Sequence, residues 1–507
     1  MHAASPPRPA VLRSLGSRLR AALLRETYAL PLDLFRVLVG CLCLAYFIRL
    51  LLEVEDFSSP DGLLDHVLLV RILWFTRLSL FQPGLGTWFF YAMFGVACLG
   101  ALGIVLGYRV KLWAALLFAI TVSSYRWNFI VLSVDDSIMH LLLFWLLLLP
   151  IGRTVVVQQW WQQRSQCWRQ WSQVTVPGTA LYCLLGNICL VYLTAGLCKL
   201  LKSTFWREGF ALYAILRQPI TYAPDMWGPQ HLPLLQVGTY LALGVELLLP
   251  FLLTRRPGHP LKWLGLLLQL GFHLGIIATL RVPFANLALM ATAILFFRVE
   301  IMRALARRWQ QCPVTLRQAP RVDRAGRVAL LLVGVLTLAM MRGLPGVGVV
   351  HKPAFALLWM VGLAQDYQLF KWVDRLSYHV EHQVVLHTPQ APRQSLPPTT
   401  VFPSSMRGVL LQVYLHNRTW MPLSRQHYQS LKHSILTRLA QRFCRTHATT
   451  GRVTAWSTIQ RIRPENVALT QGKPRFIMEF SCSQDGAVLC RTLLAPHNAS
   501  TCPDDRP

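Results

Sequence analysis

The sequence predicts a mainly α-helical fold, a polytopic membrane bundle of about nine spans followed by a C-terminal α+β domain outside the membrane. The first observation is composition: 54% of the 507 residues are hydrophobic and only 14% are charged, whereas soluble domains carry about 25% charged residues. The second is a mean hydropathy of +0.40. The third is a series of apolar segments near the roughly 20 residues that a helix needs to cross a hydrocarbon core.

The net charge fits a membrane protein better than a nucleic-acid-binding protein. The chain holds 50 Lys and Arg against 22 Asp and Glu, which leaves +28. In a membrane protein such an excess marks the basic loops of one side of the bilayer, so we expect membrane lipids, and no nucleic acid, as partners. Residues 1–30 are basic and lack a cleavage site after a short apolar core. We expect them to remain as a cytoplasmic segment ahead of the first span.

The transmembrane domain is expected to cover residues 31–342. Several of its apolar segments, including the fourth and the last two, are shorter than 20 residues, and Pro283 interrupts the end of the series. The nine segments are Leu34–Leu52, Trp88–Leu106, Leu112–Leu132, Ile138–Ile151, Ala180–Leu200, Leu234–Leu253, Trp263–Ala278, Val282–Phe297 and Val328–Met341.

The basic loops indicate the orientation of the chain, because Lys and Arg concentrate in cytoplasmic loops. With nine spans, the strongly basic loops all fall on one side, and the acidic segment Glu53–Asp65 and the C-terminal domain fall on the other. The basic loops include the N-terminal arginines, Arg109 with Lys111, Arg153–Arg169, Arg255–Lys262 and Arg298–Arg327. We therefore expect a cytoplasmic N-terminus and an outside or lumenal C-terminal domain, in a bacterial inner membrane or the endoplasmic reticulum.

Residues 343–507 are expected to form the extramembrane α+β domain, since hydrophobic runs shorten there and polar residues interleave. Leu423–Phe443 has the spacing of an amphipathic helix. Alternating or β-branched runs predict five strands. The strands are Tyr378–His387, Val409–His416, Val453–Arg461, Arg475–Ser481 and Ala487–Leu494.

The cysteines predict a disulfide bond but no metal centre. None of the 12 cysteines forms a Cys-x-x-Cys pair, so zinc and iron–sulfur sites are not expected. A domain outside the membrane meets an oxidising compartment, and Cys482 and Cys490 lie on adjacent predicted strands. They are the candidate pair, with Cys444 and Cys502 as competing partners because spacing does not determine connectivity.

Ionisable side chains inside apolar segments are costly and tend to mark functional sites. Five stand out: Lys199, Glu246, His273, Asp135 and Asp136. Each also has a purely structural explanation. A lysine near a helix end can extend to the lipid headgroups, Glu246 and His273 can be partners in neighbouring helices, and the two aspartates can cap the start of a helix.

Several stretches of the chain carry a family resemblance. They are Asp33–Gly40 with an early arginine, Val134–Ser137 followed by Leu141–Trp145, Val191–Leu200 followed by Trp206–Leu212, and the later pair Phe272 and His273. These stretches resemble the HTTM domain, the membrane domain shared with vitamin K-dependent γ-glutamyl carboxylase. The resemblance spans roughly residues 31–341 and implies a bundle of nine spans with an outside C-terminal part.

The resemblance also implies a reaction. In the carboxylases, a lysine at the position of Lys199 deprotonates reduced vitamin K, oxygen converts the hydroquinone to an epoxide, and the basic intermediate removes a γ-proton from a protein glutamate so that CO2 can add. Burial favours the neutral form of an amine, which can take a proton from a weakly acidic hydroxyl. We thus expect Lys199 and His273 as catalytic residues and Asp136, Trp206 and Glu246 as substrate-binding residues.

The reactants implied are reduced vitamin K or another quinol, O2 and CO2, with a protein or peptide substrate on the outside and no metal. Cys198 and Asp136 stand where the animal enzymes have a second lysine and a histidine. The alternative function is that of a catalytically inactive HTTM-family protein whose outside domain binds a partner. A proton-coupled transporter is disfavoured, because two related halves with broken spans are lacking.

Overall fold

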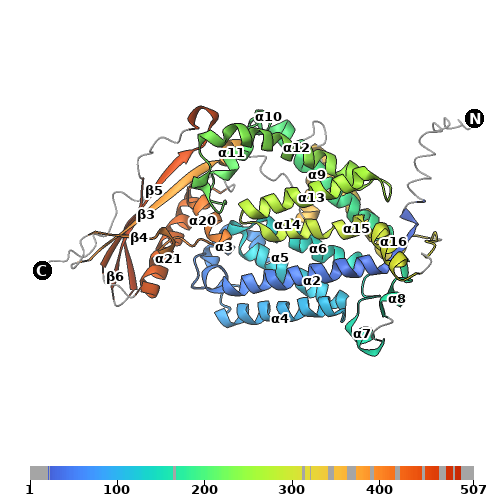
Figure 1. Ribbon diagram of the computed structural model, residues 1–507. Helices are drawn as coiled ribbons and strands as arrows, with labels where there is room; N and C mark the ends of the chain where they lie inside the picture. Colours follow the sequence, from blue (N-terminus) through green and yellow to red (C-terminus); the bar gives the residue numbers. More distant parts are fainter. Residues whose placement is uncertain are drawn as a thin grey trace, which may run out of the picture.

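The computed structural model describes residues 21–492, apart from residue 22 and several internal segments. The segments left out are 164–166, 311–313, 320, 341–347, 362, 364–372, 389–392, 417–422, 448–450, 468–474 and 484–485. The basic residues 1–20 and Cys502 lie outside the described residues. Figure 1 shows a helical bundle with a β-sheet and two long helices packed onto one of its ends.

The helical bundle is formed by the chain up to Met360. Its helices are α2 (Ala29–Leu52), α3 (His66–Ile72), α4 (Thr87–Leu106), α5 (Val110–Trp127), α6 (Val134–Leu148), α7 (Val157–Gln163), α8 (Cys167–Trp171), α9 (Thr179–Lys202), α10 (Thr204–Arg207), α11 (Ala211–Leu216), α12 (Leu232–Leu253), α13 (Pro260–Thr279), α14 (Pro283–Ala291), α15 (Ala293–Phe296), α16 (Arg298–Arg308), α17 (Arg324–Met340) and α18 (Gly348–Met360).

All nine predicted apolar segments contain helices, but nine membrane spans are not confirmed. Five helices of the described chain are long and apolar enough to cross a membrane: α2, α4, α9, α12 and α13. α6 has 15 residues and α17 has 17, and α14–α15 meets α16 at a bend of 60°. The prediction relied on apolar length, which does not separate a span from a short helix buried among other helices. α6 is of the second kind, since ten of its residues are buried.

The loops between these helices gather at two opposite ends of the bundle (Figure 1). At one end, β1 (Glu26–Tyr28) pairs with β2 (Thr175–Pro177), and Arg25 forms a β-bridge to Gln318. Glu53–Asp65 lies at the other end, against the C-terminal domain. The described residues of the predicted basic loops share one end, called the basic end below. The side of the membrane that it faces stays a prediction.

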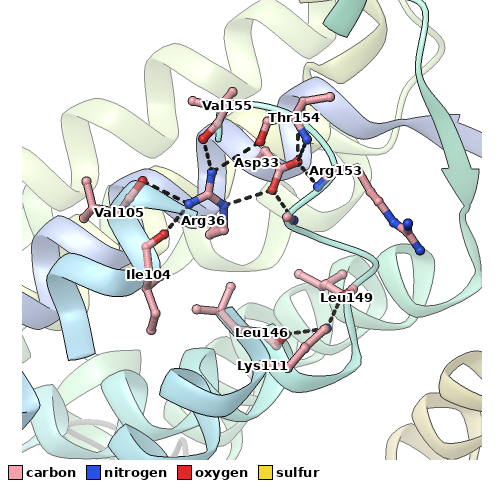
Figure 2. Close-up of polar contacts among 11 residues, drawn as sticks. Asp33, Arg36, Ile104, Val105, Lys111, Leu146, Leu149, Arg153, Thr154 and Val155 are labelled. Atoms are coloured by element: carbon pink, nitrogen blue, oxygen red, sulfur yellow. Dashed lines mark hydrogen bonds and ion pairs between the residues drawn. The ribbon is translucent and has the colours of Figure 1, made fainter. Parts of the chain in front are cut away.

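Asp33 and Arg36 of α2 hold the basic end together (Figure 2). The Asp33 carboxylate accepts hydrogen bonds of 2.6, 3.0 and 2.7 Å from the backbone N–H groups of residues 152–154. The Arg36 guanidinium donates to Asp33 (2.9 Å), to Val105 O at the end of α4 (3.0 Å) and to Val155 O (2.7 Å). Both side chains are fully buried. The early arginine of the first span is thus a structural connector between helix ends.

The C-terminal domain has a five-stranded antiparallel sheet in the order β4-β3-β5-β6-β7. Val384 of β3, Ala455 of β5 and Met478 of β6 lie side by side and are fully buried. The strands and helices are β3 (Tyr378–His387), β4 (Gln394–Leu396), β5 (Gly451–Arg461), β6 (Arg475–Ser483), β7 (Gly486–Thr492), α19 (Val373–Leu376), α20 (Met406–His416) and α21 (Arg425–His447). Four predicted strands and the amphipathic helix are confirmed.

The remaining predicted strand, Val409–His416, is wrong, because these residues form the last part of α20. Apolar residues occupy nearly every position from Val409 to Leu415, and such a run does not distinguish a buried strand from a buried helix. The α-helix hides them in the contact with the bundle and the sheet, where most are fully buried.

The predicted disulfide bond between Cys482 and Cys490 is also wrong. Cys482 bonds to Cys444 near the end of α21. In the β6–β7 hairpin, Cys482 lies opposite Ala487, and Cys490 lies three residues further along β7. Because each residue of a strand advances the chain by about 3.3 Å, Cys490 is out of reach, whereas α21 carries Cys444 across the end of the sheet.

The two domains share one continuous hydrophobic cluster, which joins Phe57 and Ile130 of the bundle to Leu410 and Leu436 of the C-terminal helices. α21 also binds the loop after α2: Arg442 Nε lies 2.6 Å from Asp56 Oδ1. The predicted boundary at 342/343 falls in an undescribed segment, and α18, which follows it, packs against α17.

Candidate functional site

Lys199 lies in the last turn of α9 and faces the interior of the bundle. Its side chain is 4% exposed, and that of Glu246 on α12 is 7% exposed. Lys199 Nζ donates a hydrogen bond to Glu246 Oε1 and lies 4.7 Å from the centre of the Trp206 ring. The alternative in which this lysine reaches the headgroups is excluded by its burial. Three predicted site residues therefore meet in one place.

Local sequence explains why these three side chains meet. Gly196 lies one helical turn before Lys199, and an added Cβ there would stand 2.8 Å from Leu247 Cδ2. The absence of a side chain at Gly196 therefore lets α12 come close to α9. Ser203 ends α9 and caps α10, where its hydroxyl accepts the Trp206 N–H at 3.3 Å. Asp374 of the C-terminal domain accepts from Thr204 N–H at 2.8 Å. The turn that carries Trp206 is thereby fixed from both domains.

His273 on α13 is buried, and both of its ring nitrogens have partners. Nδ1 lies 2.7 Å from Asn286 Oδ1, and Nε2 lies 2.6 Å from the Tyr192 hydroxyl. Asn286 donates its own Nδ2 to Val282 O, which leaves Oδ1 as the acceptor that faces the ring. Nδ1 therefore carries the proton, and Nε2 of the neutral ring accepts from Tyr192. His273 holds Tyr192 in place and has no free nitrogen in this arrangement.

Lys199, Glu246, Trp206 and His273 line a single cavity of about 500 Å³. The remaining walls are mainly apolar side chains from α9, α11, α12, α13 and α14. Sites for small molecules usually have roughly 300–1,000 Å³ and a few polar groups on apolar walls. Among the described residues, Glu246 Oε2 is buried without a hydrogen-bond partner. It is the acceptor that a bound molecule could satisfy.

The cavity reaches the exposed, apolar outer surface of the bundle. Leu241 on α12 and Leu267 on α13 both line it, and they are 62% and 68% exposed. Gly271 and Gly275 on α13 line it as well, and no atom would lie within 4 Å of a Cβ added at either. Small residues at this position leave a gap through which an apolar molecule could pass.

No family model, no curated protein and no solved structure matches the chain.

Asp136, predicted to bind substrate, does not line this cavity. Its carboxylate caps the start of α6 by accepting from Ser133 N–H (2.8 Å) and Ser133 Oγ (3.0 Å). It also accepts from the Tyr46 hydroxyl and from Arg407 Nη2 at 3.2 Å. Neighbouring Val134 and Ile138 line the cavity, while Asp136 points to the other side of α6. Its position in the helix cap agrees with the structural explanation for this residue.

Asp135 connects this charged cluster to the wall of the cavity. Its carboxylate lies 3.2 Å from Arg49 Nη1 and accepts the backbone N–H of Ala285 at 2.8 Å. Ala285 is in the first turn of α14, next to Asn286, which orients His273. The start of α14 is thus set by a charge on α6.

Asp225, His379 and Glu381 could hold a metal ion, because their ligand atoms lie within 4.8 Å of one another. His379 Nδ1 lies 3.1 Å from Arg217 O, and Nε2 lies 3.0 Å from Glu381 and 3.4 Å from Asp225. With Nδ1 as the donor to the carbonyl, Nε2 faces two carboxylates. Either a proton or a cation satisfies that arrangement, and the carboxylates are 60% and 77% exposed.

Sequence reasoning missed Tyr192, Gln269 and Asn286 at this site. Gln269 Nε2 donates to the Tyr192 hydroxyl (3.3 Å) and to Leu289 O (3.0 Å). The sequence did contain a signal for these three residues, because uncharged polar residues inside apolar segments also need buried hydrogen-bond partners. Arg407 lies in the C-terminal domain, and no local pattern connects it to Asp136.

Proposed function

We propose that the cavity binds a reduced quinone, such as reduced vitamin K, and that the Lys199–Glu246 pair takes a proton from its hydroxyl group. The observation that carries this proposal is the buried amine–carboxylate pair in the wall of an apolar cavity that reaches the outer surface of the bundle. A hydrophobic molecule with weakly acidic hydroxyl groups matches both features.

The pair can exchange a proton internally. With the shared proton on Glu246, the Lys199 amine is neutral and can accept the hydroxyl proton of the substrate, which leaves a quinolate anion beside an ammonium. Opposite charges then form together inside a low-dielectric site, where they attract strongly. Glu246 Oε2 is free to accept a hydrogen bond from the substrate. In this proposal His273 and Asn286 position Tyr192 as a polar wall of the site, and Trp206 packs against the amine.

The later steps come from the resemblance. They are the addition of O2 to the quinolate to give a strongly basic alkoxide, the transfer of the glutamate γ-proton to this alkoxide, the addition of CO2 to the resulting carbanion, and the release of quinone epoxide and water. The cavity is lined by Leu216, Trp227 and Leu280, which belong to the hydrophobic cluster shared with the C-terminal domain. A glutamate-containing peptide bound by that domain would approach the cavity from this end.

The test uses the full-length protein in lipid nanodiscs, supplied with reduced vitamin K and O2. Quinone epoxide is quantified, and incorporation of labelled bicarbonate into a glutamate-containing peptide is followed in parallel. Wild-type protein should form epoxide, and Lys199→Met should abolish it. Epoxide formation by Lys199→Met at the wild-type rate would remove the lysine from the reaction.

A matched pair of glycine variants tests the cavity itself. Gly271→Leu fills the cavity without touching Lys199 or Glu246, so it should block quinone binding and turnover. Gly244→Leu on α12 is the control, because Gly244 also has open space around it but does not line the cavity. Equal loss of binding in both variants would show that the effect is general destabilisation.

The second candidate function is an inactive family member whose C-terminal domain binds a partner. It is favoured by two observations. Both ring nitrogens of His273 have protein partners, and Lys199 and Glu246 form their ion pair without any ligand. Here Lys199 and His273 variants lower stability only. Wild-type protein that neither binds a quinone nor forms epoxide would decide for this function.

A further inference from the structure

A second hollow is lined by residues of α13, α15 and α16, and these helices meet at the basic end of the bundle, away from the C-terminal domain (Figure 1). It is a groove of about 970 Å³ between α13 on one side and α15 and α16 on the other. The groove shares none of its lining residues with the cavity beside Lys199. The groove is therefore separate from the cavity, and its role is independent of the proposed reaction.

The floor of the groove is apolar and runs along the membrane helices. It is formed by Leu266 and Leu270 of α13 and by Ile294 and Phe297, with Trp263 near the basic end. Trp263 is 48% exposed, and its ring packs 4.9 Å from that of Phe297. An indole at the end of a membrane helix is typical of the boundary between hydrocarbon and headgroups. A strip of this kind suits an acyl chain.

The rim of the groove is basic and comes from α16. This helix is bent by 60° from the preceding α14–α15, and its buried residues are Met302 and Ala306. Arg303, Ala304 and Arg307 are exposed and line the groove. A helix that turns away from the membrane helices with apolar residues on one face and arginines on another has the character of a helix in the bilayer interface.

The charges in the groove leave it positive. Its one acidic lining residue, Glu300, is paired: Oε1 lies 2.8 Å from Lys262 Nζ and 3.2 Å from the backbone N–H of Gly258. Within the described part of the chain, neither Arg303 nor Arg307 has a carboxylate in ion-pair distance. Two guanidinium groups four residues apart on a helix face the same side, and both can bind a phosphate oxygen.

We infer that this groove is a binding site for an anionic phospholipid of the bilayer. One acyl chain lies along Leu266, Leu270 and Ile294, and the phosphate lies between Arg303 and Arg307. The class of ligand follows from the combination of a long apolar floor with an uncompensated pair of arginines at its interfacial end. A zwitterionic phospholipid fits the floor equally well but is not favoured by the net charge of the rim.

Native mass spectrometry of the detergent-purified full-length protein tests the inference, with phosphatidylglycerol and phosphatidylcholine of the same chain length as probes. The wild type should prefer phosphatidylglycerol by about tenfold. Arg303→Gln/Arg307→Gln should bring the two affinities close together. Arg308→Gln/Arg321→Gln is the charge-matched control, because both residues are exposed near the basic end and neither lines the groove; it should keep the preference.

A third variant tests whether the groove, and not only the charge, holds the lipid. Ala304→Trp fills the groove while leaving both arginines in place, so it should weaken the binding of both phospholipids. Equal affinity of the wild type for the two phospholipids would overturn the inference. It would also be overturned if the control lost the preference as fully as the groove variant, or if Ala304→Trp bound both lipids like the wild type.

Discussion

Arg407 of the C-terminal domain donates a hydrogen bond of 3.2 Å to Asp136 of the bundle, across 271 residues of sequence. Their side chains are 2% and 1% exposed. Glu53 lies 3.7 Å from Arg407 Nε, and burial raises the pKa of this glutamate, although Arg407 and Arg49 oppose the rise. A charge in each domain is thus buried in the contact between them, where water cannot replace either partner.

Breaking this pair should destabilise the protein strongly. Removal of one partner leaves the other buried charge without its nearest opposite charge, which costs about 3–5 kcal/mol. We expect that Arg407→Met or Asp136→Asn lowers the free energy of unfolding by this amount, as measured by chemical denaturation in detergent. Arg442→Met is the comparison, since its pair with Asp56 is partly exposed and should contribute below about 1 kcal/mol. Similar losses for Arg407→Met and Arg442→Met would contradict a special role for the buried pair.

The Lys199–Glu246 pair allows stability to be separated from activity. Lys199→Met alone should destabilise by about 3–5 kcal/mol because it isolates a buried carboxylate. The double variant Lys199→Met/Glu246→Leu removes both charges and should recover most of that stability, while epoxide formation stays absent. Thermal unfolding and turnover are measured on the same preparations. Recovery of turnover together with stability would assign the pair to folding alone.

Acid should destabilise the C-terminal domain through two half-buried histidines. Burial lowers the pKa of His382 to about 4 and that of His416 to about 3, against about 6.5 in an unfolded chain. Between these values the unfolded state binds more protons, so stability present above about pH 6.5 is lost as the pH falls toward 4, by up to about 3 kcal/mol for each histidine. The protection factors against hydrogen exchange of β3 and α20 in the full-length protein, calculated against the slower intrinsic exchange at low pH, should fall over this range.

Two variants make the pH prediction specific. His416→Phe removes a ring whose Nε2 is buried without a hydrogen-bond partner among the described residues, so it should flatten the pH dependence. His433→Gln on the exposed side of α21 should leave it unchanged. An unaltered pH profile in His416→Phe would show that other groups cause the acid response.

Because Cys444 and Cys482 form one disulfide bond, we expect substitution of either cysteine to lower stability equally. Cys444 and Cys482 close a loop with a sequence separation of 38, which stabilises by about 3–4 kcal/mol in the chain-entropy treatment. Cys444→Ser and Cys482→Ser should each lower stability to this extent, and Cys490→Ser should have little effect. Non-reducing peptide mapping checks the pairing directly. A Cys482–Cys490 peptide would contradict the structure.

Local patterns predicted helices and strands well where one face of an element is apolar and the other polar. Tyr378–His387 was predicted to the residue, because alternation along a half-buried strand is visible in its own sequence. Val409–His416 failed because all its faces are buried, so its periodicity carries no information. The count of nine spans is not confirmed for a related reason, since helices covered by protein can be as apolar as those covered by lipid.

The site divides in the same way. Lys199, Glu246 and His273 were recognised from their positions in apolar segments and Trp206 from the family resemblance, and the cavity places the four together. Asp136 was recognised by the same reasoning and lies elsewhere. A charged residue in an apolar segment indicates that it has a partner. It does not indicate whether that partner is a ligand or an arginine of another domain.

By itself, the amino-acid order determined the membrane class, the apolar segments, most of the C-terminal strands and several candidates for buried polar side chains. These properties depend on neighbours within a few residues. Only the tertiary structure decided that Lys199 meets Glu246, that Arg407 meets Asp136, and that Cys482 bonds to Cys444. Each of those choices depends on how whole helices and strands pack, and packing brings together groups that no local spacing relates.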